Sequence, residues 1–140
     1  MGMTDYGANL IAEAFVGITS TPTLYLALTA FEPEESDTAD DLVEPSDAAY
    51  ARQPVLMGSS YWATPYSGVS TFTEEIAFST ATEDWEGMYY WALCTDLTSG
   101  QIVLWGNFDA GYQVTEGNQA IIPPNAFGVA VSSESNVTMA

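Results

Sequence analysis

The sequence has almost no positive charge. It contains one arginine, no lysine and no histidine, against 19 aspartates and glutamates, and its formal net charge is −18 over 140 residues. Without histidine or lysine, one chain cannot build a Ser-His-Asp triad, a histidine metal site, a Schiff base or the lysine of a P-loop. A single arginine cannot neutralise a nucleic-acid backbone, and an anionic membrane surface would repel the chain. We therefore expect no nucleic-acid partner, no membrane partner and no enzymatic activity.

Cysteine and long apolar runs are also scarce. Cys94 is the only cysteine, so no disulfide framework exists, and its place in an apolar run predicts a small buried side chain. No run approaches the roughly 20 apolar residues of a membrane span, and the first residues lack the positive charge of a signal peptide. These absences predict a protein made as a soluble cytosolic chain.

Apolar residues are plentiful, at 47% of the sequence, and 140 residues suffice for one domain with one core. We therefore predict a single domain over 1–140, with a helical N-terminal appendage at 1–20, an acidic surface loop at 32–47 and a tail at 133–140. The absence of lysine favours adaptation to molar salt, in which the Debye length falls to about 3 Å. The alternatives are that acidity gives solubility or meets a basic partner.

The N-terminal residues predict a short amphipathic helix. Thr4 or Asp5 can cap it, and Gly17 can end it in a left-handed conformation. The apolar residues that share one helical face are Leu10, Ile11, Ala14 and Phe15. This face is a candidate docking or self-association surface, and the equally weighted alternative is that it covers an open end of the chain's own fold.

Alternating residues after the helix predict short strands joined by turns. The expected strands are 24–29, 52–57, 71–79, 88–95, 102–105, 112–114, 120–122 and 127–131. Pro54 places its strand at a sheet edge, whereas 88–95 is apolar on both faces and is expected in the centre. Asp109-Ala-Gly111 is interpreted as a turn. This spacing predicts an all-β fold, an antiparallel jelly-roll-like β-sandwich with a short N-terminal helix.

Eight carboxylates crowd the segment 32–47, where Pro33 and Pro45 oppose regular structure. Ca²⁺ prefers oxygen ligands of this kind, and no other cofactor is expected. The candidate Ca²⁺ ligands are Asp37, Asp40, Asp41, Glu44 and Asp47. Because their spacing does not match an EF-hand, we favour a solvated, mobile surface loop.

Paired carboxylates are the only candidate catalytic residues that remain. Glu74 with Glu75, or the run Glu83-Asp84-Trp85-Glu86, could supply an acid and a nucleophile about 5 Å apart, as in retaining glycosidases. The four tryptophans and eight tyrosines could also stack on sugars. In so acidic a chain, however, adjacent carboxylates are expected on solvated faces, and aromatic side chains usually fill the core of a small sandwich.

Arg52 is the only side chain with a fixed positive charge, so we expect it to form an ion pair. We favour a structural pair that anchors the start of the strand after Tyr50, or a contact between subunits. The alternative is recognition of a ligand carboxylate. On the structural interpretation, replacing Arg52 would weaken folding or assembly more than any other surface change.

Several stretches resemble a family of small structural proteins of tailed viruses, of the tail-fibre or capsid-decoration type. The most specific is Tyr-Ala-Arg-Gln-Pro-Val at 50–55. The other matching stretches are Phe15-Val-Gly17, Thr23-Leu-Tyr-Leu-Ala-Leu28, 78–85, 96–106, 114–118 and 127–131. The chain departs from the family pattern in its longer acidic loop at 32–47 and in an aromatic insertion around 61–66.

The resemblance implies a non-enzymatic component of the virion surface, made in the host cytoplasm. Our leading interpretation is a capsid decoration or turret protein from a virus of a halophilic host. The alternative is a tail-fibre or baseplate component that contacts host glycans, and a third is a secreted carbohydrate-binding or hydrolytic module. Expected partners are the major capsid protein or tail proteins, together with further copies of this chain as a trimer or pentamer.

Overall fold

The computed structural model describes residues 2–15, 23–58, 60–66 and 68–130, and residues 12–15 through their backbone alone. Strands dominate it, with one α-helix and one short 3-10 turn. The elements in chain order are β1 (Gly2–Met3), α1 (Asp5–Phe15), β2 (Leu24–Thr29), η1 (Ala39–Asp41), β3 (Gln53–Val55), β4 (Val69–Thr71), β5 (Ile76–Ala77), β6 (Met88–Cys94), β7 (Ile102–Tyr112), β8 (Ile121–Ile122) and β9 (Gly128–Ala130). The predicted all-β sandwich with a short N-terminal helix is confirmed. No helix within the described residues is long and apolar enough to span a membrane.

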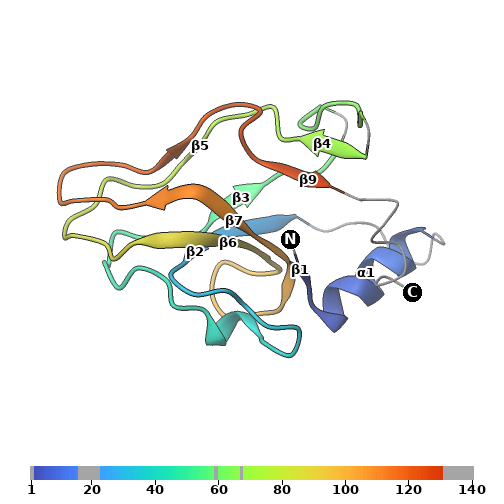
Figure 1. Cartoon of the computed structure of the whole chain (residues 1–140), viewed down its shortest axis with the longest axis horizontal. Coiled ribbons are helices and arrows are strands. Elements are labelled where there is room, and N and C mark those ends of the chain that lie inside the picture. The colour runs from blue at the N-terminus through green and yellow to red at the C-terminus, as the bar shows by residue number, and fades with distance from the viewer. Residues whose placement is uncertain (1, 16–22, 59, 67, 131–140) are drawn as a thin grey trace.

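The main layer is a five-stranded antiparallel sheet in the order β1-β7-β6-β2-β3. Strand β6 lies in its centre and β3, which contains Pro54, lies at its edge, so both predicted positions are confirmed (Figure 1). The second layer consists of two short antiparallel ribbons, β4-β9 and β5-β8. Proline fits at the edge because it has no N–H to donate to a further strand.

The main core lies between one face of the sheet and the two ribbons. Alternate residues of β2 (Leu24, Leu26, Leu28) and of β6 (Trp91, Leu93) point into it. Aromatic side chains close it from the ribbon side, where Phe127 meets Trp91 edge-to-face with ring centroids 4.8 Å apart. Alternation with a period of two therefore assigns one face of β2 and β6 to this core.

The opposite face of the sheet is covered by the acidic segment 32–47. Ala92 and Cys94 of β6 pack there with Ala27, Ile102 and Trp105, and the segment contributes Ala39 and Leu42. This covering explains why β6 is apolar on both faces. The expectation of a solvated surface loop is therefore wrong for Ala39 and Leu42, because these residues cover the second face of the sheet.

Helix α1 docks on a bulge of β7. The pairing of β7 with β6 shifts between Leu93 and Cys94, so Val103 is an extra residue whose carbonyl faces the helix. Thr4 caps the helix through a bond from the Gly7 N–H to its hydroxyl (3.0 Å), and that hydroxyl also donates to the Ile102 carbonyl. Gly7 allows this approach, because a Cβ there would lie 2.1 Å from the Val103 oxygen. The predicted Thr4 cap is confirmed, whereas Gly17 lies outside the described residues.

Two strand predictions are wrong in their extent. The expected strand 71–79 is two strands, β4 and β5, because the chain leaves β9 and then pairs with β8. The expected turn Asp109-Ala-Gly111 lies inside the continuous strand β7. There the pairing jumps from Met88↔Tyr112 to Tyr90↔Asn107, and Gly111 has φ +69°. The turn-forming residues therefore make a bulge, which keeps β7 beside β6.

The predicted tail 133–140 lies outside the described residues.

Candidate functional site: an apolar cleft beside an anchored acidic segment

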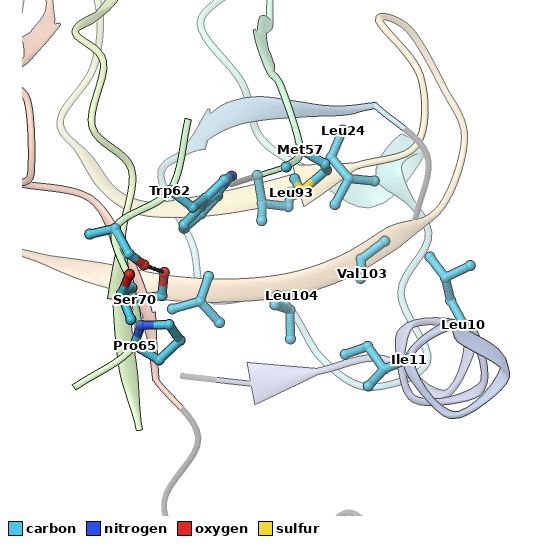
Figure 2. A pocket seen from close by; sticks show the side chains of 14 residues that line it. Leu10, Ile11, Leu24, Met57, Trp62, Pro65, Ser70, Leu93, Val103 and Leu104 are labelled. Atoms are coloured by element: carbon cyan, nitrogen blue, oxygen red, sulfur yellow. Dashed lines mark hydrogen bonds between the residues drawn. The ribbon is translucent and has the colours of Figure 1, made fainter. Parts of the chain in front are cut away.

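An open apolar cleft of about 850 Å³ lies between α1 and the segment 57–70 (Figure 2). Its floor is formed by sheet residues that point up from three strands, namely Leu24, Leu93, Val103 and Leu104. Leu10 and Ile11 of the helix form one wall. The opposite wall comes from Trp62, Pro65 and Ser70, and Met57 and Ala63 also line the cleft. The cleft is thus the space that helix α1 and the segment 57–70 leave open above the sheet.

The cleft offers apolar surface and few polar groups. Among the described residues that line it, the side-chain polar groups belong to Thr64, Ser70 and Trp62, and none is ionisable. The Ser70 hydroxyl donates to the Ala63 carbonyl at 2.7 Å, and the Trp62 indole N–H donates to the Leu56 carbonyl at 3.0 Å. The cleft can therefore bury apolar side chains, and none of its described lining residues can form an acid–base pair.

The predicted helix face is only partly described. Leu10 and Ile11 are half-buried, pack against the main core and line the cleft. They therefore cover part of the chain's own fold, and their role in docking or self-association stays a prediction. The side chains of Ala14 and Phe15 lie outside the described part of the chain. The sequence showed the wall that contains Trp62 as an aromatic insertion around 61–66. It did not show that this insertion lies opposite the helix, because no sequence periodicity links the two segments.

Arg52 is buried within the chain, with 4% of its surface exposed. Its guanidinium forms a bidentate ion pair with Glu44, with Nε to Oε1 and Nη2 to Oε2 both at 2.9 Å. It also donates to the carbonyls of Asp96 (2.9 Å), Ser99 (2.8 Å) and Ala39 (3.5 Å). All five N–H donors are therefore used inside the chain. Arg52 is not a surface residue, and its guanidinium retains no N–H for a ligand carboxylate or a second subunit.

Tyr50 extends this network toward the core. Its hydroxyl donates to the Glu44 carboxylate at 2.7 Å and accepts the Leu28 N–H at 3.1 Å. Burial, together with the negative charge of Glu44, raises the pKa of Tyr50 far above its ordinary value. The alternate residues Tyr50 and Arg52 thus bind the same carboxylate, which gives the Tyr-Ala-Arg motif a structural role.

Asp47 fastens the acidic segment to the loop before β6. Its carboxylate accepts the N–H groups of Ala49 (2.9 Å) and Thr82 (2.7 Å), the Thr82 hydroxyl, and the Trp85 indole N–H (2.9 Å). The hydrogen bonds from the Thr82 hydroxyl, Ala49 and Trp85 hold the pKa of Asp47 well below its ordinary value of 3.8. The segment 44–52 is therefore anchored by Asp47 as well as by Arg52.

The other candidate Ca²⁺ ligands do not converge. Asp37 accepts the Glu34 N–H and Asp41 accepts the Thr38 N–H, each at 2.9 Å, and Asp40 is exposed. Glu44 and Asp47 are engaged by the partners given above. In the part of the chain that the structure describes, no three acidic, histidine or cysteine side chains are placed to hold a metal ion.

We expect Asp47→Asn to lower the melting temperature at neutral pH by several degrees, since an amide cannot accept all the donors that face Asp47. Because the folded pKa is lowered, this stabilisation is complete above the unfolded pKa and is lost as the pH falls below about 4. Thermal melts at several pH values would show a constant gap between wild type and variant from about pH 7 to 5, narrowing toward about pH 2. A gap that stays constant throughout would contradict this role.

The residues considered for catalysis are spread over the surface or engaged in structure. Glu74, Glu75, Glu83 and Glu86 are exposed, and Asp84 accepts the Glu116 N–H at 2.8 Å. Trp85 is buried against Asp47 and cannot stack on a sugar. Cys94 is buried as predicted, and burial raises the pKa of its thiol to about 12. None of these residues lines the cleft.

The cleft offers apolar surface, and the buried ionisable side chains Asp47 and Arg52 are bonded within the chain, so the described site has the character of a binding surface. Comparison with known families gives the particular class. The chain belongs to the family described as podophage GP4 fiber I protein gp80, whose model matches residues 2–130. No curated protein matches the chain. It is thus a structural virion protein of the phage fibre type, which associates with other virion proteins. The family favours the tail-fibre alternative over the leading interpretation of capsid decoration.

Proposed function

We propose that this chain is a non-enzymatic subunit of a fibre on the tail of a tailed virus. The observation that carries the proposal is the family match, which spans all but the ends of the chain. In this proposal the apolar cleft is the surface through which the subunit contacts a neighbouring virion protein. The anchored acidic segment supports such a role, because it fixes the sheet that forms the floor of the cleft.

Host glycans fit this cleft less well than a protein segment does. Sugar recognition combines an aromatic platform with several free hydrogen-bonding groups, and here the Ser70 hydroxyl and the Trp62 indole N–H are already bonded to backbone carbonyls. Tyr66, 84% exposed, is a better candidate for sugar stacking, but it does not line the cleft. Apolar side chains of another protein match the lining more closely.

The proposal is tested on purified virions with an antibody against this chain, detected by immunogold electron microscopy. We expect gold at the tail. Gold spread over the head would overturn the tail assignment and restore capsid decoration. Absence of the chain from particles, established by mass spectrometry of the same sample, would overturn the virion role itself.

We also propose that the protein works in a saline environment. Its one cationic side chain is buried and paired, so no exposed lysine, arginine or histidine offsets the repulsion among its carboxylates. We expect the melting temperature to rise by about 10 °C or more between dilute buffer and about 1 M KCl, because the Debye length falls to about 3 Å. Equal stability in both buffers, measured by calorimetry, would contradict this setting.

A further inference from the structure

A small polar pocket lies on the second face of the main sheet, apart from the apolar cleft. Its volume is about 180 Å³, and the described residues that line it are Glu32, Tyr90, Trp105, Gly106 and Asn107. None of them lines the cleft. The acidic segment covers this sheet face with Ala39 and Leu42, which pack in one cluster with Trp105, whereas Asn107 beyond it is exposed. The pocket therefore lies where the covering of the second face ends.

Two central strands hold three of the lining side chains in fixed positions. Tyr90 of β6 lies directly opposite Asn107 of β7. Trp105 comes two residues before Asn107 in the same strand and therefore lies on the same face of the sheet. Trp105 is also packed into the second core cluster, with 7% of its surface exposed. Side chains that are carried by paired strands are positioned more precisely for a ligand than side chains on loops.

The pocket presents hydrogen-bonding groups that the fold does not use. Within the part of the chain that the structure describes, no hydrogen bond engages the Glu32 carboxylate, the Tyr90 hydroxyl or the Asn107 side-chain amide. Elsewhere the same kinds of group are engaged, as the Tyr50 hydroxyl and the Asn118 amide are. A carboxylate accepts hydrogen bonds, whereas a hydroxyl and an amide both donate and accept them. The pocket therefore suits a ligand that has both donors and acceptors.

The lining residues also limit the charge of the ligand. Glu32 repels an anion, and the only cationic side chain of the chain, Arg52, is bonded elsewhere. One carboxylate does not make a metal site, and the described residues contain no group of three metal ligands. An ammonium ligand would depend on attraction to one exposed carboxylate, which is screened beyond about 3 Å in about 1 M salt. A neutral ring with several hydroxyls and an apolar C–H face fits these groups, because it can hydrogen-bond and also pack against an aromatic ring.

We propose that this pocket binds one neutral sugar ring of a glycan. The ring of Tyr90 packs against the C–H face of the sugar, and Trp105 closes the inner end of the pocket. The Asn107 amide and the Glu32 carboxylate form hydrogen bonds with the sugar hydroxyls. This inference goes beyond the proposed function, since it concerns a different surface from the cleft and does not depend on the position of the chain in the virion.

The test is an NMR titration of the purified, isotope-labelled chain. The probes are glucose, mannose, galactose and N-acetylglucosamine, each as the free sugar and as its methyl glycoside, in which the anomeric oxygen is substituted as it is within a glycan. We expect at least one methyl glycoside to bind with a Kd of about 1–10 mM and to shift the amide signals of Tyr90 and Asn107. Because the ligand is neutral, its affinity should change less than about twofold between about 0.1 M and about 1 M KCl.

Two matched pairs of variants assign the binding to the pocket. Tyr90→Phe removes the hydroxyl and Asn107→Ala removes the amide, and each should weaken binding at least about threefold. The control for the first is Tyr89→Phe, which changes the preceding residue of β6, outside the pocket. The control for the second is Asn9→Ala, at an exposed position of α1. Both controls should bind as wild type does, and urea denaturation shows that each variant is folded.

Several results would overturn the inference. They are binding of none of the probes, binding of free sugars but not of methyl glycosides, signal shifts confined to other residues such as the exposed Tyr66, and wild-type affinity in both Tyr90→Phe and Asn107→Ala. A marked loss of affinity in about 1 M KCl would also overturn it, because such a loss indicates a charged ligand. None of these results bears on the position of the chain in the virion, which immunogold labelling tests separately.

Discussion

Arg52→Ala is expected to destabilise the protein by about 3–5 kcal/mol, a large part of the roughly 5–15 kcal/mol that holds a domain of this size folded. The substitution leaves the Glu44 carboxylate without its bidentate partner and removes the donor from three carbonyls, those of Ala39, Asp96 and Ser99. Breaking a buried pair costs more than the pair contributes, because the remaining charge loses its compensation. Urea denaturation gives the free energy of unfolding, and a loss below about 1 kcal/mol would contradict this role.

Two further variants separate geometry from net charge. Arg52→Ala changes the net charge from −18 to −19, and adding Glu35→Gln at an exposed position returns it to −18. If the loss comes from the broken network, this second change recovers little of it. Arg52→Lys keeps the charge but has three donors and no planar fork, so we expect it to recover only part of the lost stability. Full recovery of the stability by Arg52→Lys would mean that the positive charge alone, and not the geometry of the guanidinium, stabilises the fold.

The strands were predictable from the sequence where each face of a strand is either wholly in the core or wholly outside it. Strand β2 alternates and has one face in the main core, and β6 is apolar on both faces and lies in the centre of the sheet. The pattern failed where glycine permits a bulge, at Gly111, since the same residue types make turns and bulges. It also could not reveal β1, because two residues are too short to show any alternation.

The candidate site was predictable only in part, because its walls are far apart in the sequence. Helical spacing identified Leu10 and Ile11, but nothing local indicates that they face Trp62 across the sheet. The acidic segment shows the opposite difficulty. Its composition predicted solvation, but Glu44 is bound by Arg52, eight residues further along the chain, and Asp47 by Thr82, 35 residues further along. A charge count cannot show which carboxylates find such partners.

Gly7→Ala is expected to destabilise the protein by about 2–3 kcal/mol, although alanine in place of glycine normally stabilises a helix by about 1 kcal/mol. The substitution destabilises the protein here because the new Cβ would lie 2.1 Å from the Val103 carbonyl oxygen and 2.8 Å from the carbonyl carbon. These are backbone atoms of the sheet, so no side-chain rotation relieves the contact. The helix must move away, which strains the bonds of Thr4 to Gly7 and to the Ile102 carbonyl.

This displacement links the fold to the proposed binding surface, because Leu10 and Ile11 lie one turn further along the same helix and form a wall of the cleft. Asn9→Ala, at an exposed position of α1, is the matched control and should leave stability unchanged or slightly raised. Chemical denaturation gives the free energy of unfolding of both variants. A Gly7→Ala variant as stable as wild type would show that the helix can move away from Val103 without cost, and that the docking of Gly7 does not hold Leu10 and Ile11 in place.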